Sequence, residues 1–211
     1  MIADSVRDLE AADASPWLAD RFRRFFAERA AAQRSPLFLH KFTGWPRARF
    51  IDAVLPGTRF VHVVRDGRAV ATSWLQQEWW RGHLGPSGWH FGPLPPDYEK
   101  EWDASGRSFV LLAGLAWKLL LDAFDESRAV VGEERWFELR YEDLVADPRR
   151  TTTEVLEFLG LRWTEAFDAG FNAFRFEPAR PDSWRQVVGH AAAAELDASL
   201  AEHLVRRGYE H

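Results

Sequence analysis

The 211-residue chain is 46% hydrophobic and 28% charged, which is the balance of a globular domain able to bury a substantial core. Its net charge of -5 excludes the broad positive field that proteins coating nucleic acid or anionic membranes need. The chain has no cysteine, which excludes disulfides and thiolate metal sites. We therefore expect one domain, residues 1–211, that holds any anionic ligand locally.

The N-terminal sequence carries charges throughout and lacks the apolar core of a secretory signal. The most apolar stretch, Phe109 to Leu121, is interrupted by Lys118 and is too short to span a bilayer. These features predict a cytoplasmic protein that binds neither nucleic acid nor a membrane.

The first half of the chain alternates helical and extended patterns, which predicts an α/β fold with a parallel sheet covered by helices. Ser15 and a following proline indicate the start of the first helix. The segment Arg59–Val64 is rich in β-branched residues and is the best strand candidate in the chain. The predicted elements are a helix over Pro16–Arg34, a short strand at Leu37–His40, a helix over Pro46–Leu55, a strand at Arg59–Val64 and a helix over Gly67–Trp80.

The second half begins with residues Arg81 to Gly106, in which glycines and prolines alternate with aromatic residues and predict one long loop. Its tryptophans either form the floor of an acceptor pocket or pack over a helix. Asp147 and Pro148 predict the start of a helix that ends before Gly160. The remaining predicted elements are a helix from about Ser108 to Val131, a strand at Trp136–Arg140 and a helix from about Ala191 to Arg207.

The segment Val64–Trp74, VRDGRAVATSW, lies where a predicted strand turns into a helix. Anions bind at such junctions because free backbone N–H groups and the helix dipole point at them. Arg65 leaves the strand end with a charged fork, Gly67 allows a close turn, and Ser73 lies about two turns into the helix. The residues predict a phosphate site, with the alternative that Arg65 pairs with Asp66 or a neighbouring carboxylate and that Ser73 is merely packed.

This segment resembles the one by which sulfotransferases bind the 3′-phosphate of their donor PAPS (3′-phosphoadenosine 5′-phosphosulfate). An arginine closing a strand, an Asp-Gly-Arg turn and a serine eight residues after the first arginine carry the resemblance. It implies that Arg65 and Ser73 bind the nucleotide. It also implies the family's P-loop-NTPase-like three-layer fold, with a parallel sheet flanked by helices.

The resemblance extends to both sides of the motif. Upstream, LHKFTGWPRARFIDAVLPGTRF resembles the family's segment in which a lysine motif and a helix lead into the arginine strand. This implies that Lys41 contacts the transferred sulfuryl group. YEDLVADP is similar to a segment common in the family, although we expect Tyr141, Glu142 and Asp143 to close a strand rather than to perform chemistry. PDSWRQVV resembles a stretch of the tyrosylprotein branch.

That last stretch implies a sulfate-facing role for Ser183, while Arg185 either adds to the nucleotide clamp or lies on the surface. Lys41 could likewise be an exposed charge at a strand end, because a lysine serves sulfuryl oxygens only if it points at them. No group of histidines and carboxylates has metal-ligand spacing, so we expect PAPS as co-substrate and no metal.

The chain departs from the family in one respect. Family members hold the 5′-phosphosulfate with a loop of the form G-x-x-R-S-G-T-[ST]-L near the N-terminus, whereas the first glycine here is Gly44. The N-terminal strand-loop-helix is therefore expected to be missing. Truncation, a partner chain that supplies the loop, or loss of activity would each explain this.

A complete site would transfer the sulfuryl group in line from PAPS to an acceptor hydroxyl or amine. The acceptor is not indicated, and no single general base stands out among the candidates His40, His83, His90 and Glu78. A non-catalytic relative or fragment that binds 3′,5′-ADP or PAPS is the alternative. A nucleotide-dependent kinase is less favoured, because it would need a Gly-Lys-[ST] loop.

Overall fold

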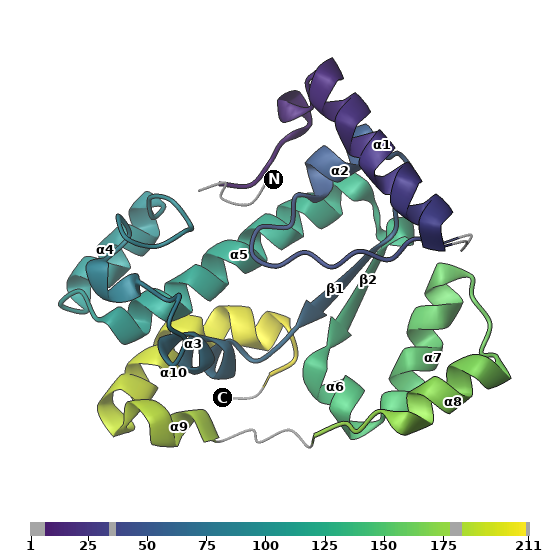
Figure 1. The fold of residues 1–211 in the computed structure, drawn as a ribbon. Helices are drawn as coiled ribbons and strands as arrows, with labels where there is room; N and C mark the ends of the chain where they lie inside the picture. Colours follow the sequence, from purple (N-terminus) through teal and green to yellow (C-terminus); the bar gives the residue numbers. More distant parts are fainter. Residues whose placement is uncertain (1–6, 34–36, 178–182, 210–211) are drawn as a thin grey trace. The chain divides into compact units, whose positions relative to one another are not determined.

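The computed structural model describes residues 7–33, 37–177 and 183–209, and helices make up most of it (Figure 1). The chain divides into two units. The first comprises Met1–Phe60 and Leu119–Trp136, and the second comprises Val61–Lys118 and Phe137–His211. None of the described helices is long and apolar enough to cross a membrane.

The first unit contains two whole helices, α1 (Pro16–Gln33) and α2 (Ala48–Val54), and the last part of the long helix α5 (Phe109–Val131) from Leu119 onward. It also contains 3-10 turns at Ala11–Asp13 and Glu133–Arg135. The Ser15 hydroxyl accepts a hydrogen bond from the backbone N–H of Leu18 at 3.4 Å, which confirms the predicted helix start. Phe50 and Val54 are completely buried, and the edge of Phe22 packs on Phe50 with ring centroids 5.3 Å apart. The apolar face of α2 therefore forms the core of this unit.

The predicted strand at Leu37–His40 is wrong, because residues 37–47 form neither helix nor strand. A strand needs a neighbour to take its backbone hydrogen bonds, and the two described strands pair only with each other. The side chains of this segment pack on α1 instead. The ring centroid of Phe26 lies 5.3 Å from that of Phe38 and 5.4 Å from that of His40.

The sheet consists of β1 (Phe60–Val64) and β2 (Trp136–Arg140), which are hydrogen-bonded neighbours and run in the same direction (Figure 1). Both strands occur where the sequence predicted them. Each is followed by a helix, α3 (Gly67–Leu75) after β1 and α6 (Tyr141–Ala146) after β2. This strand-helix pattern confirms the α/β class, and the ends of two parallel strands come together at one edge.

The core of the second unit is provided by the first part of α5 (Phe109–Val131), up to Lys118, and by the helix α10 (His190–Arg206). Leu112 and Leu115 of α5 and Leu196 and Leu200 of α10 are completely buried. The remaining helices of this unit are α4 (Pro96–Ala104), α7 (Pro148–Leu159), α8 (Glu165–Ala173) and α9 (Ser183–Val188). The predicted capping of α7 is confirmed, since Asp147 accepts from the N–H of Arg150 and Gly160 adopts the left-handed conformation.

The prediction of one long loop over Arg81–Gly106 is wrong, because this stretch contains α4 and a 3-10 turn at Gly82–Leu84. Pro96 is the first residue of α4, a position at which proline favours rather than breaks a helix. The acidic residues Asp97 and Glu99 follow in the first turn, where they complement the helix dipole. The prolines therefore mark a helix start.

Gly67, the first residue of α3, packs directly on the indole ring of Trp117 from α5. A Cβ atom at this position would lie 2.5 Å from two ring carbons, well inside van der Waals contact. Only glycine brings the β1–α3 turn this close to α5 without displacing the ring.

Replacing Gly67 with alanine should lower the free energy of unfolding by about 2 kcal/mol, because Trp117 must move. Urea denaturation would measure the loss. Gly170→Ala is the matched control, since a Cβ there meets nothing within 4 Å and alanine favours a helix. Equal stability of the Gly67→Ala variant and the wild type would contradict the packing argument.

Candidate functional site

The turn between β1 and α3 is held by its own residues before any ligand is considered. The carboxylate of Asp66 caps α3 by accepting from the backbone N–H of Arg68 at 2.8 Å. The Arg68 guanidinium also donates to both oxygens of this carboxylate, from Nε at 3.0 and 3.2 Å and from Nη2 at 2.7 Å. Asp66 is therefore engaged by Arg68 on both its oxygens.

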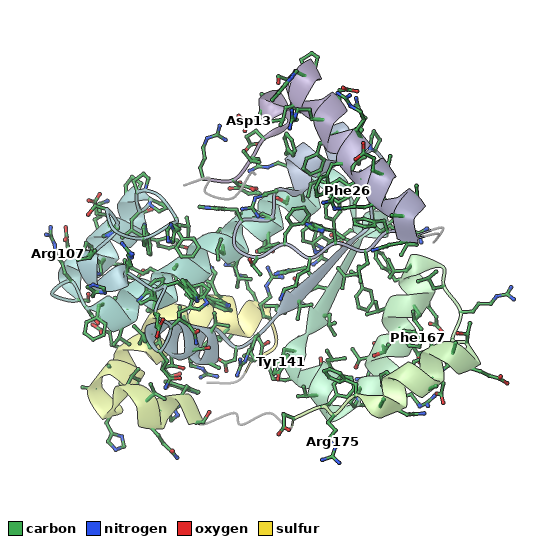
Figure 2. All side chains as sticks on the ribbon, viewed as in Figure 1. Asp13, Phe26, Arg107, Tyr141, Phe167 and Arg175 are labelled. Carbon is green, nitrogen blue, oxygen red and sulfur yellow. The ribbon has the colours of Figure 1, made fainter. Side chains whose placement is uncertain are left out.

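Arg65, the first residue after β1, is half-buried. Its guanidinium lies 4.9 Å from the ring centroid of Tyr141, the residue that follows β2 and is labelled in Figure 2. Within the described residues no carboxylate pairs with Arg65, so the alternative in which it pairs with Asp66 is not what the structure contains. The guanidinium is held by a ring face.

Arg68 is the buried charge of this region, with 8% of its side chain exposed. It bridges Asp66 on its own turn and Asp197 on α10, each at 2.7 Å. Burial alone would lower the pKa of Arg68, but the hydrogen bonds that its guanidinium donates to the two carboxylates outweigh burial and raise the pKa above its usual value. Arg68 therefore remains charged and ties α3 to α10.

The sequence reasoning did not select Arg68 or Asp197. One signal for Arg68 was available: a cation in the first turn of a helix is unfavourable with the helix dipole and needs carboxylates nearby. Asp197 gave no signal, because its role depends on a contact between residues 129 positions apart.

Arg185 joins the same network. Its Nη1 lies 2.9 Å from Asp197, and its guanidinium covers the ring of Trp184 at 4.4 Å. Ser183 is exposed at the start of α9, where the buried Trp184 anchors the helix. Pro181 and Asp182 of the predicted motif lie outside the described residues.

Glu142 links the β1–α3 turn to Tyr209, which follows α10. One carboxylate oxygen accepts from the backbone N–H of Asp66 at 3.1 Å, and the other accepts from the hydroxyl of Tyr209 at 2.7 Å. Tyr209 is 6% exposed. Burial raises the pKa of Tyr209, and its hydrogen bond to Glu142 raises it further. Glu142 thus lies in the first turn of α6, after the end of β2, and its carboxylate contacts the turn of the candidate phosphate site.

The other predicted residues are placed as follows. Ser73 is half-buried on α3 beside the buried Thr72. Lys41 is exposed in the irregular segment of the first unit, whereas Arg65, Ser73, Ser183 and Arg185 belong to the second. The four candidate bases, His40, His83, His90 and Glu78, are all exposed.

The tryptophans in the predicted loop and just before it mostly pack on one another. Trp80 and Trp89 are buried with 7% and 5% exposed, and Phe91 stacks on Trp74 of α3 with centroids 5.6 Å apart. Trp79 remains 47% exposed. The described contacts are those of packing against α3.

No set of three or more histidine, aspartate or glutamate side chains within the described part of the chain is arranged to hold a metal ion. At the β1–α3 turn the structure places the guanidinium of Arg65, a group of the kind that binds anions.

Residues 6–165 match the sequence profile of the sulfotransferase family. Over 191 residues the chain is 27% identical to the omega-hydroxy-beta-dihydromenaquinone-9 sulfotransferase Stf3 of Mycobacterium bovis and to that of Mycobacterium tuberculosis. The alignments cover 89% of this chain but 45% of each relative, so the chain spans less than half the length of these relatives.

A solved structure, the sulfotransferase domain of the olefin synthase from Synechococcus PCC 7002, matches with a TM-score of 0.56 and 22% identity. The match covers 92% of this chain and 65% of that domain. At this identity the likeness supports the P-loop-like α/β fold alone.

Replacing Arg68 with methionine should destabilise the protein by about 3 kcal/mol, because Asp66 loses its partner in a buried position. Chemical denaturation would measure it. Arg150→Met is the matched control, since its pair with Glu154 is about half exposed and should be worth less than about 1 kcal/mol. Similar losses in both variants would contradict a structural role for the buried bridge.

Tyr209 should make stability fall at alkaline pH. Its pKa in the folded protein lies above the usual 10.0, so its contribution is complete below pH 10 and is lost as pH rises beyond that value. Between pH ~10 and ~11 the free energy of unfolding should fall by up to about 1.4 kcal/mol more in the wild type than in Tyr209→Phe. Urea titrations across this range test it, and parallel curves would contradict it.

Proposed function

Because the chain belongs to the sulfotransferase family, we propose that it contributes to the transfer of a sulfuryl group from PAPS to an acceptor hydroxyl or amine. The observation that carries the proposal is the state of Arg65. It follows β1 at the edge where both strands end, and Asp66, its neighbouring carboxylate, is occupied by Arg68. A half-buried arginine without a carboxylate partner in the described structure is suited to bind a phosphate.

In this proposal Arg65 and Ser73 bind the 3′-phosphate of the nucleotide. Arg65 supplies the charge, and Ser73 supplies a hydroxyl from the α3 helix that begins immediately after the turn. The dipole of α3 also favours an anion there, although Asp66 already accepts the N–H of Arg68 in the first turn. The Arg68 bridge supports binding by fixing the start of α3 on α10.

Transfer would require little covalent work from the protein, because catalysis in such reactions is positioning together with stabilisation of charge on the departing oxygens. We assign the latter role to Lys41 and to Ser183. Arg185 would be a further contact to the nucleotide, and its ion pair with Asp197 also holds α9 to α10. The acceptor would bring the hydroxyl or amine that attacks sulfur.

The test is calorimetric titration with 3′,5′-ADP and with 5′-AMP, which lacks the 3′-phosphate. We expect tighter binding of 3′,5′-ADP, and a loss of affinity of about tenfold or more in Arg65→Ala, because a charge-assisted contact is removed. The affinity for 5′-AMP should change little.

Arg162→Ala is the matched control, since Arg162 is an exposed arginine of the same unit outside the turn. It should bind both nucleotides like the wild type. Equal affinity of the wild type for the two nucleotides, or an unchanged preference in Arg65→Ala, would refute the assigned 3′-phosphate site.

A further inference from the structure

The last described residues of the chain are attached to both strands of the sheet. Arg207 contacts both carboxylate oxygens of Glu138 on β2 at 2.9 Å, and Glu138 lies 3.2 Å from Nδ1 of His62 on β1. The side chains of Arg207 and His62 are 8% and 6% exposed. The segment that follows α10 is therefore fixed along the sheet, and Tyr209 comes two residues later.

Tyr209 reaches the candidate phosphate turn through a single carboxylate. Its hydroxyl donates to one oxygen of Glu142 at 2.7 Å, and the other oxygen accepts from the backbone N–H of Asp66 at 3.1 Å. A carboxylate with a donor on each oxygen has its rotation fixed. The N–H of Asp66 belongs to the peptide that joins Asp66 to Arg65, so the position of Glu142 governs where the Arg65 backbone leaves β1.

Two ring contacts surround this chain of hydrogen bonds. The Arg140 guanidinium lies 4.4 Å from the ring centroid of Tyr209, and Arg65 lies 4.9 Å from that of Tyr141. Arg140, Tyr141 and Glu142 are consecutive, so one short stretch at the end of β2 contacts both the C-terminal segment and Arg65. A displacement of Tyr209 would therefore act on the same residues that orient Arg65.

We infer that Glu142 and Tyr209 are positioning residues that set the orientation of Arg65 for the 3′-phosphate of a nucleotide. This inference rests on the proposed function, because it concerns the same site. Neither residue touches the ligand. Both act through the Asp66 peptide, and the orientation matters because the planar guanidinium binds phosphate through a directional pair of hydrogen bonds.

Tyr209→Phe removes one hydroxyl and keeps the ring that packs on Arg140. We expect its affinity for 3′,5′-ADP to fall about fivefold while its affinity for 5′-AMP stays within about twofold, because only the 3′-phosphate contact is disturbed. Calorimetry at a temperature where the variant is fully folded measures both. Glu142→Gln, which retains only one carbonyl oxygen for two donors, should show the same selective loss.

A double-variant cycle distinguishes positioning from general loosening. Lysine at position 65 is a flexible point charge that needs little orientation. In an Arg65→Lys background, Tyr209→Phe should therefore weaken 3′,5′-ADP binding by less than about twofold. Arg162→Ala, an exposed arginine of the same unit outside this network, is the control: in either background it should leave the preference for 3′,5′-ADP over 5′-AMP unchanged.

The outcomes separate the two proposals. Loss of 3′,5′-ADP preference in Arg65→Ala but not in Tyr209→Phe and Glu142→Gln would overturn the positioning role and leave the phosphate site standing. Equal weakening of both nucleotides, or the same effect of Tyr209→Phe in the Arg65→Lys background, would show a merely structural role. No preference for 3′,5′-ADP in the wild type would overturn both.

Discussion

The buried bridge of Arg68 between Asp66 and Asp197 is the interaction on which the candidate site depends. A buried guanidinium costs several kcal/mol in lost hydration unless carboxylates surround it, and here each carboxylate is 2.7 Å away. The bridge joins α3 to α10, which are neighbours only in the folded chain. It also occupies the carboxylate that would otherwise neutralise Arg65, so one ion pair fixes the turn and leaves its first arginine available for an anion.

The surrounding contacts support the same turn from different sides. Gly67 lies against the ring of Trp117, which sets the approach of the turn to α5. Glu142 holds the amide of Asp66, and Tyr141 presents its ring to Arg65. The Glu142 and Tyr141 contacts come from the segment after β2, because parallel strands bring their carboxyl ends to one edge. The adjacency of β1 and β2 is therefore a condition for the site.

The elements predicted well from the sequence are those whose ends are encoded locally. The helix α7 begins at Pro148 after the Asp147 cap and stops at Gly160, and β2 runs over Trp136–Arg140 as predicted. The errors arose where a local pattern has two meanings. Pro96 lies in a proline-rich stretch that predicts a loop, but proline also begins helices. The apolar run Leu37–His40 predicts a strand, but a strand exists only with a partner.

The sequence by itself determined the α/β class, the strand-turn-helix at Arg65 and Ser73, and the family, because residues close along the chain encode them. The tertiary structure alone decided which charges pair. Asp197 is 129 residues from Arg68, and Tyr209 is 67 residues from Glu142. Pairing over such distances follows from how α10 packs on α3 and on the strand ends, and no local pattern contains that information. The sequence shows that a carboxylate is present, but only the folded chain determines which cation or hydroxyl lies next to it.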